Sequence, residues 1–167
     1  MEEESNRFRK HSESRVEEVS EFTVTPAPVI SYINFEVLKQ LGTGAFGKVY
    51  LATFRPTGCN YAVKVLNKKK LFSKKQLKYA VGETNILKKM DSPFIIKLHF
   101  AFQTPSNLYM VLDNCSLGDL AELITIKDYL KEKTARFVIA QLILAIEYLH
   151  SHNILYRDLK PENILIS

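Results

Sequence analysis

A dense group of polar side chains lies in the last stretch of the sequence, YRDLKPENILIS (156–167). Asp158 could accept the proton of a hydroxyl group or orient that hydroxyl for in-line attack. Lys160 could neutralise charge on a phosphoryl group in transit, and the amide oxygen of Asn163 could hold a magnesium ion. Because phosphoryl transfer depends mostly on positioning and charge stabilisation, these residue types indicate that reaction.

A second group of residues suits phosphate binding. The stretch LGTGAFGKVYLA places Gly42, Gly44 and Gly47 in G-x-G-x-x-G spacing. Glycines let a backbone approach phosphate oxygens closely and present N–H groups to them. A dinucleotide-binding fold would require a helix directly after Gly47, but KVYLATF has a strand pattern. The spacing, which is weak on its own, therefore fits a hairpin that lies over a nucleotide.

The third candidate is Lys64, which apolar strand residues flank in YAVKVL. Such a lysine can simply be an edge residue whose ammonium group reaches water. Lys64 follows the glycine hairpin, however, and could reach phosphates from the next strand. Glu83 in the following helical stretch supplies a carboxylate that could hold it, because pairing reduces the cost of burying either charge.

The elements that must position these residues follow from hydrophobic periodicity and turn residues. Alternation predicts five strands, and helical spacing predicts a helix with Gly82 inside it, a short helix and a long one. The order of strands, one helix, strands and helices indicates an α+β fold with two unlike halves. The predicted strands are 35–42, 48–55, 60–67, 94–103 and 107–114, and the predicted helices are 75–90, 118–125 and 131–151.

The long helix over 131–151 has apolar side chains on all sides, which is typical of a buried helix. Too few residues follow it to cover this surface, so we expect a continuation of the chain or a partner to do so. The apolar residues are Phe137, Val138, Ile139, Leu142, Ile143, Leu144, Ile146 and Leu149.

The formal net charge is +5, and the positive excess is concentrated in NKKKLFSKKQLK (67–78). The simplest interpretation of these lysines is a solvated helical face, and the alternative is contact with a partner that carries phosphate or acidic groups. We expect no nucleic-acid partner, because no aromatic or glycine-rich binding module accompanies the basic stretch.

Nothing in the sequence predicts secretion or a transmembrane segment. The start, MEEESNRFRK, lacks the apolar region of a secretory signal, and the longest apolar stretch is too short and too polar to span a bilayer. Cys59 and Cys115 do not make a disulfide framework, so reduced thiols are the simplest interpretation. We expect a cytoplasmic protein with access to the nucleus.

Together, the glycine loop, Ala-Val-Lys at 62–64, Glu83 and Arg-Asp-Leu-Lys-Pro-Glu-Asn at 157–163 resemble the eukaryotic serine/threonine protein kinases. Tyr156, where histidine is usual, together with LYMVL, EYLHS and FIIKLHFAF, is similar to the AGC group, near protein kinases A and B. The resemblance implies a protein-kinase-like α+β fold. It has an antiparallel five-stranded N-lobe with one regulatory helix, followed by the start of a helical C-lobe.

The resemblance also implies a division of the chain. We expect a flexible extension over 1–33 and a kinase domain fragment over 34–167. Within the fragment, the N-lobe would cover about 34–112, and the hinge with a partial C-lobe would cover about 113–167.

By the same resemblance, ATP and Mg²⁺ are the expected cofactors. Asp158 and Lys160 would be catalytic, and Asn163 would bind magnesium. Adenine would lie between Leu41, Val49, Ala62 and Leu165, with Leu112 as gatekeeper, while Asp113 and Cys115 would pair with its edge through their backbones and Asp119 would bind ribose. The full ATP-binding set is Leu41, Gly42, Thr43, Gly44, Ala45, Phe46, Gly47, Val49, Ala62, Lys64, Glu83, Leu112, Asp113, Cys115, Asp119 and Leu165.

The resemblance further implies partners. Asp119 and Glu162 match positions that read basic side chains, so we expect protein substrates with basic residues near the phosphoacceptor. An upstream activating kinase is a further candidate partner, and Lys75 and Gln76 could contact a phosphorylated hydrophobic tail. Tyr79 and Ala80 depart from the His-Thr pair common in the group, which puts contact with a phosphorylated activation loop in doubt.

The sequence does not contain the family's Asp-Phe-Gly motif, whose aspartate chelates magnesium. We therefore expect this polypeptide alone to have little or no kinase activity, and to be a fragment or truncated gene model of an active kinase. The alternative is a non-catalytic truncated module that binds ATP or competes for a kinase partner. A small-molecule phosphotransferase shares the glycine loop, but the string at 157–163 argues against it.

Overall fold

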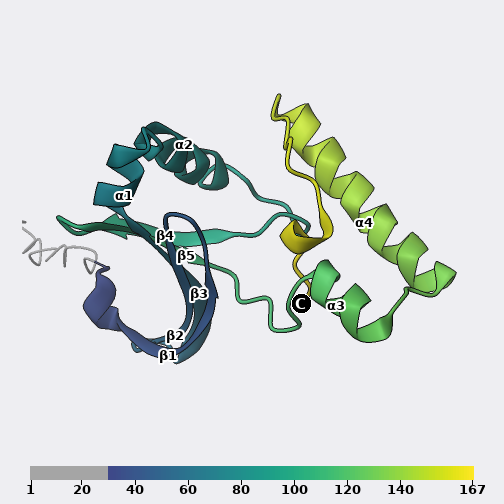
Figure 1. Ribbon diagram of the computed structural model, residues 1–167, viewed down its shortest axis with the longest axis horizontal. Coiled ribbons are helices and arrows are strands. Elements are labelled where there is room, and N and C mark those ends of the chain that lie inside the picture. The colour runs from purple at the N-terminus through teal and green to yellow at the C-terminus, as the bar shows by residue number, and fades with distance from the viewer. Residues whose placement is uncertain (1–29) are drawn as a thin grey trace, which may run out of the picture.

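A computed structural model describes residues 30–167, so most of the predicted extension over 1–33 lies outside the described residues. The described part has two unlike halves (Figure 1). A sheet carries two helices on one side, and two further helices stand apart from it. The C-terminal segment, drawn in yellow, runs between the two halves, so the polar stretch 156–167 lies where they meet.

The five predicted strands are present and form one antiparallel sheet in the order β1-β2-β3-β5-β4. This arrangement confirms the predicted α+β fold with a five-stranded antiparallel first lobe. The strands are β1 (Phe35–Thr43), β2 (Gly47–Phe54), β3 (Cys59–Asn67), β4 (Leu98–Gln103) and β5 (Asn107–Leu112).

Four α-helices and two 3-10 turns complete the described part of the chain. Asp119 caps α3 through a hydrogen bond from the Glu122 N–H to its Oδ1, 2.8 Å long. Asn67 caps α1 in the same way, accepting from the Lys70 N–H at 3.0 Å. The elements are η1 (Tyr32–Asn34), α1 (Lys68–Ser73), α2 (Leu77–Leu87), α3 (Leu120–Lys127), α4 (Glu132–Ser151) and η2 (Pro161–Asn163).

The predicted helices did not include α1, and several predicted boundaries differ from the structure, two of them for a clear backbone reason. The expected helix over 75–90 is shorter, because Lys75 has a positive φ of 54° and separates α1 from α2. The expected strand over 94–103 begins only at Leu98. The N–H of Ile95 donates to the Ser92 carbonyl at 3.1 Å, and this turn uses backbone groups that a strand would need.

Each face of the sheet has its own hydrophobic core. On the side of α1 and α2, Ala62, Leu71 and Met110 are buried together, and Leu77 and Leu87 pack against them. On the opposite face, aromatic side chains surround the buried residues. Phe35 and Phe54, whose ring centroids are 5.0 Å apart, belong to this second cluster. The strands are therefore fixed from both sides.

The long helix α4 is only partly covered. Ala145 and Leu149 are buried, whereas Phe137 and Ile143 are 68% and 61% exposed. The apolar residues on all sides of this helix predicted that it is buried. Within the described residues, however, only one face of α4 is covered. No helix within residues 30–167 has the length and apolar character needed to cross a membrane.

Candidate active site

The predicted pairing of Lys64 with Glu83 is present. Lys64 lies in β3 between Val49 of β2 and Met110 of β5 in the ladder, and its Nζ is 2.7 Å from Glu83 Oε1 in α2. The Lys64 side chain is 29% exposed, which means that the ion pair is shielded in part but still accessible to a ligand. The pair joins the sheet to the helix that covers it.

The glycine-rich hairpin joins β1 to β2, as predicted, and its three glycines differ in their surroundings. A Cβ on Gly47 would lie 1.8 Å from the Val65 carbonyl oxygen of β3, so packing alone requires glycine there. A Cβ on Gly42 or Gly44 would meet nothing within 4 Å. The structure therefore leaves open space above these two positions, which a phosphate group could use.

The loop that contains Asp158 has a compact set of polar contacts. The Asn163 side-chain amide donates to the Asp158 carbonyl oxygen at 2.8 Å and to its Oδ2 at 2.9 Å. Lys160 Nζ lies 3.1 Å from Asp158 Oδ1. The hydrogen bond from Asn163, followed by that from Lys160, lowers the pKa of Asp158 below its ordinary value. Asp158 is therefore a carboxylate at neutral pH.

Tyr156 connects this loop electrostatically to the ion pair. Burial raises the pKa of its phenol, and the negative charges of Asp158 and Glu83 raise that pKa further. A single hydroxyl thus lies within electrostatic reach of both carboxylates, one from the C-terminal loop and one from α2. The two chemically active groups predicted from distant parts of the sequence consequently share one region of the molecule.

The segment after β5 forms the connection between the two halves. Leu112, the predicted gatekeeper, is buried in the core on the α2 side, and Asp113 and Cys115 follow it. Partial burial, and then the charge of Asp113, raise the pKa of the Cys115 thiol. A raised pKa leaves Cys115 as a neutral thiol at physiological pH, which does not indicate a nucleophile.

The other predicted nucleotide contacts come from β1, β2, β3, the start of α3 and the C-terminal segment. Asp119 pairs with Leu165 in an isolated antiparallel bridge, which brings the C-terminal strand-like segment beside the start of α3. Leu41 and Leu165 are 45% and 48% exposed although both are large and apolar. Val49 packs against the same core that contains Ala62. These apolar side chains are suitable for covering a flat aromatic ring.

The magnesium prediction can be compared with the donors present. The amide nitrogen of Asn163 is used by Asp158, so its oxygen is the atom that remains for a cation. Within residues 30–167 no group of three or more acidic, histidine or cysteine side chains gathers as a metal site. Mg²⁺ usually takes one or two protein oxygens together with water and substrate phosphates, and Asn163 fits that pattern.

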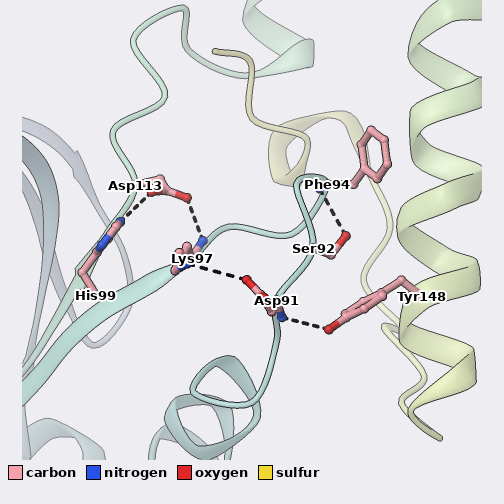
Figure 2. Close-up of polar contacts among 7 residues, drawn as sticks. All are labelled: Asp91, Ser92, Phe94, Lys97, His99, Asp113 and Tyr148. Atoms are coloured by element: carbon pink, nitrogen blue, oxygen red, sulfur yellow. Dashed lines mark hydrogen bonds and ion pairs between the residues drawn. The ribbon is translucent and has the colours of Figure 1, made fainter.

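Sequence reasoning missed one polar residue beside the predicted site. His99 of β4 has its Nε2 2.7 Å from Asp113 Oδ1 (Figure 2). Its sequence context, LHFAF, gave no signal for this contact, because the contact depends on how β4 aligns with β5. A hollow of about 680 Å³ lies elsewhere, and none of the predicted nucleotide contacts lines it. It lies against α4, where Ile139, Leu142, Ile143 and Ile146 line it together with Leu159.

This combination of a glycine hairpin, a strand lysine paired with a helix glutamate, and an Asp158–Lys160–Asn163 loop defines the class of protein. The chain belongs to the protein kinase family, whose protein kinase domain matches residues 35–167. The predicted class, an ATP-binding serine/threonine protein kinase, is thereby confirmed at the level of the family.

Named relatives agree with that assignment. The chain is 48% identical over 133 residues to Protein kinase 3 of Dictyostelium discoideum. It is 47% identical over 136 residues to the serine/threonine-protein kinase SCH9 of Saccharomyces cerevisiae, and 47% identical over 134 residues to the serine/threonine-protein kinase Sgk1 of Rattus norvegicus. SCH9 and Sgk1 are both named serine/threonine-protein kinases, in agreement with the resemblance described above.

The alignments cover most of this chain and a small part of each relative. Each covers 80% of the chain, but only 15% of Protein kinase 3, 16% of SCH9 and 31% of Sgk1. The chain therefore spans less than a third of the length of each of these relatives.

Proposed function

We propose that the full-length gene product transfers the γ-phosphoryl group of ATP to serine and threonine hydroxyls of proteins. The observation that carries this proposal is the Lys64–Glu83 ion pair, 2.7 Å long, in the same region as the Asp158–Asn163 loop. Family membership supports the reaction type. Phosphoryl transfer needs a cationic group at the nucleotide and a carboxylate at the acceptor hydroxyl, and the two pairs supply them.

In this proposal the nucleotide lies between the glycine hairpin and the segment after β5. The open space over Gly42 and Gly44 admits phosphate oxygens, and Lys64, held by Glu83, neutralises them. Leu41 and Leu165 cover the adenine ring, and the backbone of Asp113 and Cys115 pairs with its edge. Asp119, which also caps α3, holds the ribose.

The acceptor hydroxyl lies at Asp158 in this arrangement. The carboxylate orients the hydroxyl for in-line attack, and Lys160 stabilises charge on the transferring group. The Asn163 amide, through its two hydrogen bonds to Asp158, fixes the rotamer of the carboxylate. A magnesium ion held in part by the Asn163 oxygen would neutralise phosphate charge when bound.

Acidic groups near the loop support a preference for basic substrates. Glu162 is exposed in the η2 turn, and Asp119 lies at the start of α3, which contacts that turn. We propose that these two carboxylates attract basic side chains beside the phosphoacceptor residue. An activating kinase and a cytoplasmic location with nuclear access belong to the same proposal.

The function is tested by removing the two charges that it depends on. The variants Lys64→Met and Asp158→Ala, alone and together, are assayed in the full-length gene product for transfer of radiolabelled phosphate to a basic peptide and to a panel of small-molecule alcohols. Each single variant should reduce transfer to the peptide at least a hundredfold. Lys88→Met, at an exposed lysine just after α2, serves as the matched control. Normal transfer by the double variant would refute the proposal. Labelling of the small-molecule alcohols without labelling of the peptide would mean that the substrates are small molecules rather than proteins.

A further inference from the structure

The side chain of Asp113 is held at both of its oxygens (Figure 2). Its Oδ1 lies 2.7 Å from His99 Nε2, and its Oδ2 accepts the Lys97 N–H at 2.8 Å. Its own backbone N–H donates to the Lys97 carbonyl at 3.2 Å. Three contacts from one short stretch, Lys97 to His99, therefore fix the first residue after β5.

The direction of the His99 side chain has a specific backbone cause. Leu98 pairs with Leu112, but Phe100 pairs with Val111, so β4 contains one extra residue at His99. Such a β-bulge bends the strand and redirects the side chain of the extra residue. The His99 ring then packs against Tyr61 of β3, with 4.8 Å between ring centroids. The His99 side chain is 26% exposed, compared with 44% for Asp113, so the histidine is the more firmly packed partner.

The stretch that holds Asp113 is itself tied to the helical half of the molecule. Lys97 Nζ lies 3.6 Å from Asp91 Oδ1, and the Asp91 N–H donates to the Tyr148 hydroxyl of α4 at 2.8 Å (Figure 2). The Lys97 and Asp91 side chains are 59% and 91% exposed, so this ion pair is weak, and the backbone of Lys97 rather than its side chain holds Asp113.

We propose that His99 is a positioning residue for nucleotide binding, acting through the Asp113 carboxylate. This inference rests on the proposed function, in which the backbone of Asp113 pairs with the adenine edge. The Asp113 N–H is used by Lys97, so its carbonyl oxygen is the backbone group that remains for adenine. Holding the carboxylate at both oxygens restricts rotation of this residue and presents that carbonyl in one orientation. A nucleotide then loses less conformational freedom from the protein when it binds.

The experiment compares the KM for ATP with kcat and with the KM for a basic peptide in the full-length gene product. His99→Ala should raise the KM for ATP about 3- to 10-fold, the range expected for losing one hydrogen bond to a charged group. The values of kcat and of the peptide KM should change less than about twofold, because His99 is not expected to touch the transferring group. His99→Gln, whose amide can still donate near the Nε2 position, should restore most of the ATP affinity.

A double-mutant cycle assigns the effect to the contact. Asp113→Asn should raise the KM for ATP, and the double variant with His99→Ala should be little worse than the more severe of the two single variants. Lys97→Ala is the matched control, because only the backbone of Lys97 contacts Asp113. It should leave the KM for ATP unchanged.

Two results would overturn the inference. One is an unchanged KM for ATP in both His99→Ala and Asp113→Asn. The other is a lower melting temperature and kcat with the KM for ATP intact, which would make His99 a purely structural residue. If His99→Ala fails to fold, the KM for ATP of Asp113→Asn and of His99→Gln tests the inference instead. A raised KM in Asp113→Asn with a nearly normal KM in His99→Gln would support it, and an unchanged KM in Asp113→Asn would overturn it. Retained transfer in Lys64→Met would instead refute the proposed function, so the two failures are distinguishable.

Discussion

At the scale of single residues, the ionisation of Asp158 depends on its neighbours rather than on burial, since its side chain is 67% exposed. Hydrogen bonds from Asn163 and Lys160 favour the charged form and lower its pKa below the ordinary 3.8. A lowered pKa in the folded state means that these contacts stabilise the fold above the unfolded-state pKa. That contribution is lost as the pH falls through the folded-state pKa.

We predict that Asn163→Ala raises the pKa of Asp158 towards its ordinary value, because the largest stabilising contact of the carboxylate is removed. Lys160→Met should raise it as well. The pKa is measured directly by following the Asp158 carboxyl carbon in an NMR titration between pH 2 and 6. Activity is not a suitable measure, because Asn163→Ala would also remove a proposed magnesium ligand. Glu162→Gln, in the same turn, is the control. An Asp158 pKa that stays low in both variants would contradict the hydrogen-bond explanation.

At the scale of elements, the hairpin between β1 and β2 contains one glycine that packing requires and another that leaves space for a ligand. Gly47 lies against the backbone of β3, whereas a Cβ on Gly44 would meet nothing within 4 Å. Gly44 takes part in the hairpin through its N–H, which donates to the Gly47 carbonyl at 2.9 Å. The two glycines of one motif therefore have different physical reasons for being glycine.

We predict that Gly47→Ala reduces the free energy of unfolding by about 1–3 kcal/mol, because its methyl group would force β2 away from the Val65 carbonyl. Gly44→Ala should leave stability nearly unchanged and weaken binding of a fluorescent ATP analogue roughly threefold to tenfold, or about 1 kcal/mol. Urea denaturation and equilibrium titration measure the two effects. If both variants lose stability equally, or if Gly44→Ala binds the nucleotide normally, this division of roles is wrong.

At the scale of the whole molecule, the fold and most of the candidate site could be predicted from the sequence, but from different kinds of pattern. Alternating apolar residues set the strands, and the flanking apolar residues of Lys64 indicated a shielded ammonium group that needs a partner such as Glu83. His99 was missed because its contact depends on a one-residue bulge in β4, which hydrophobic alternation does not reveal. The early start predicted for β4 failed for a similar reason, since a local turn at Ser92 overrides the apolar run.

The contact between Asp91 and Tyr148 belongs to this largest scale, because it joins the loop after α2 to α4 across the two halves (Figure 2). The loop also leads into β4, so one hydroxyl constrains both the helix that carries Glu83 and the strand that carries His99. The contact is exposed, and water can partly replace the lost hydroxyl. Its removal should therefore cost less than the loss of a buried hydrogen bond.

We predict that Tyr148→Phe lowers the free energy of unfolding by about 0.5–1 kcal/mol and raises hydrogen exchange in residues 91–97. Denaturant titration and exchange measured by mass spectrometry follow the two effects in the full-length gene product. Tyr79→Phe provides the control, because the Tyr79 side chain is 71% exposed on α2. Faster exchange confined to 91–97, with the β1–β2 hairpin unaffected, would locate the effect at the junction. Unchanged exchange there would mean that packing of the Tyr148 ring, rather than its hydroxyl, holds the two halves together.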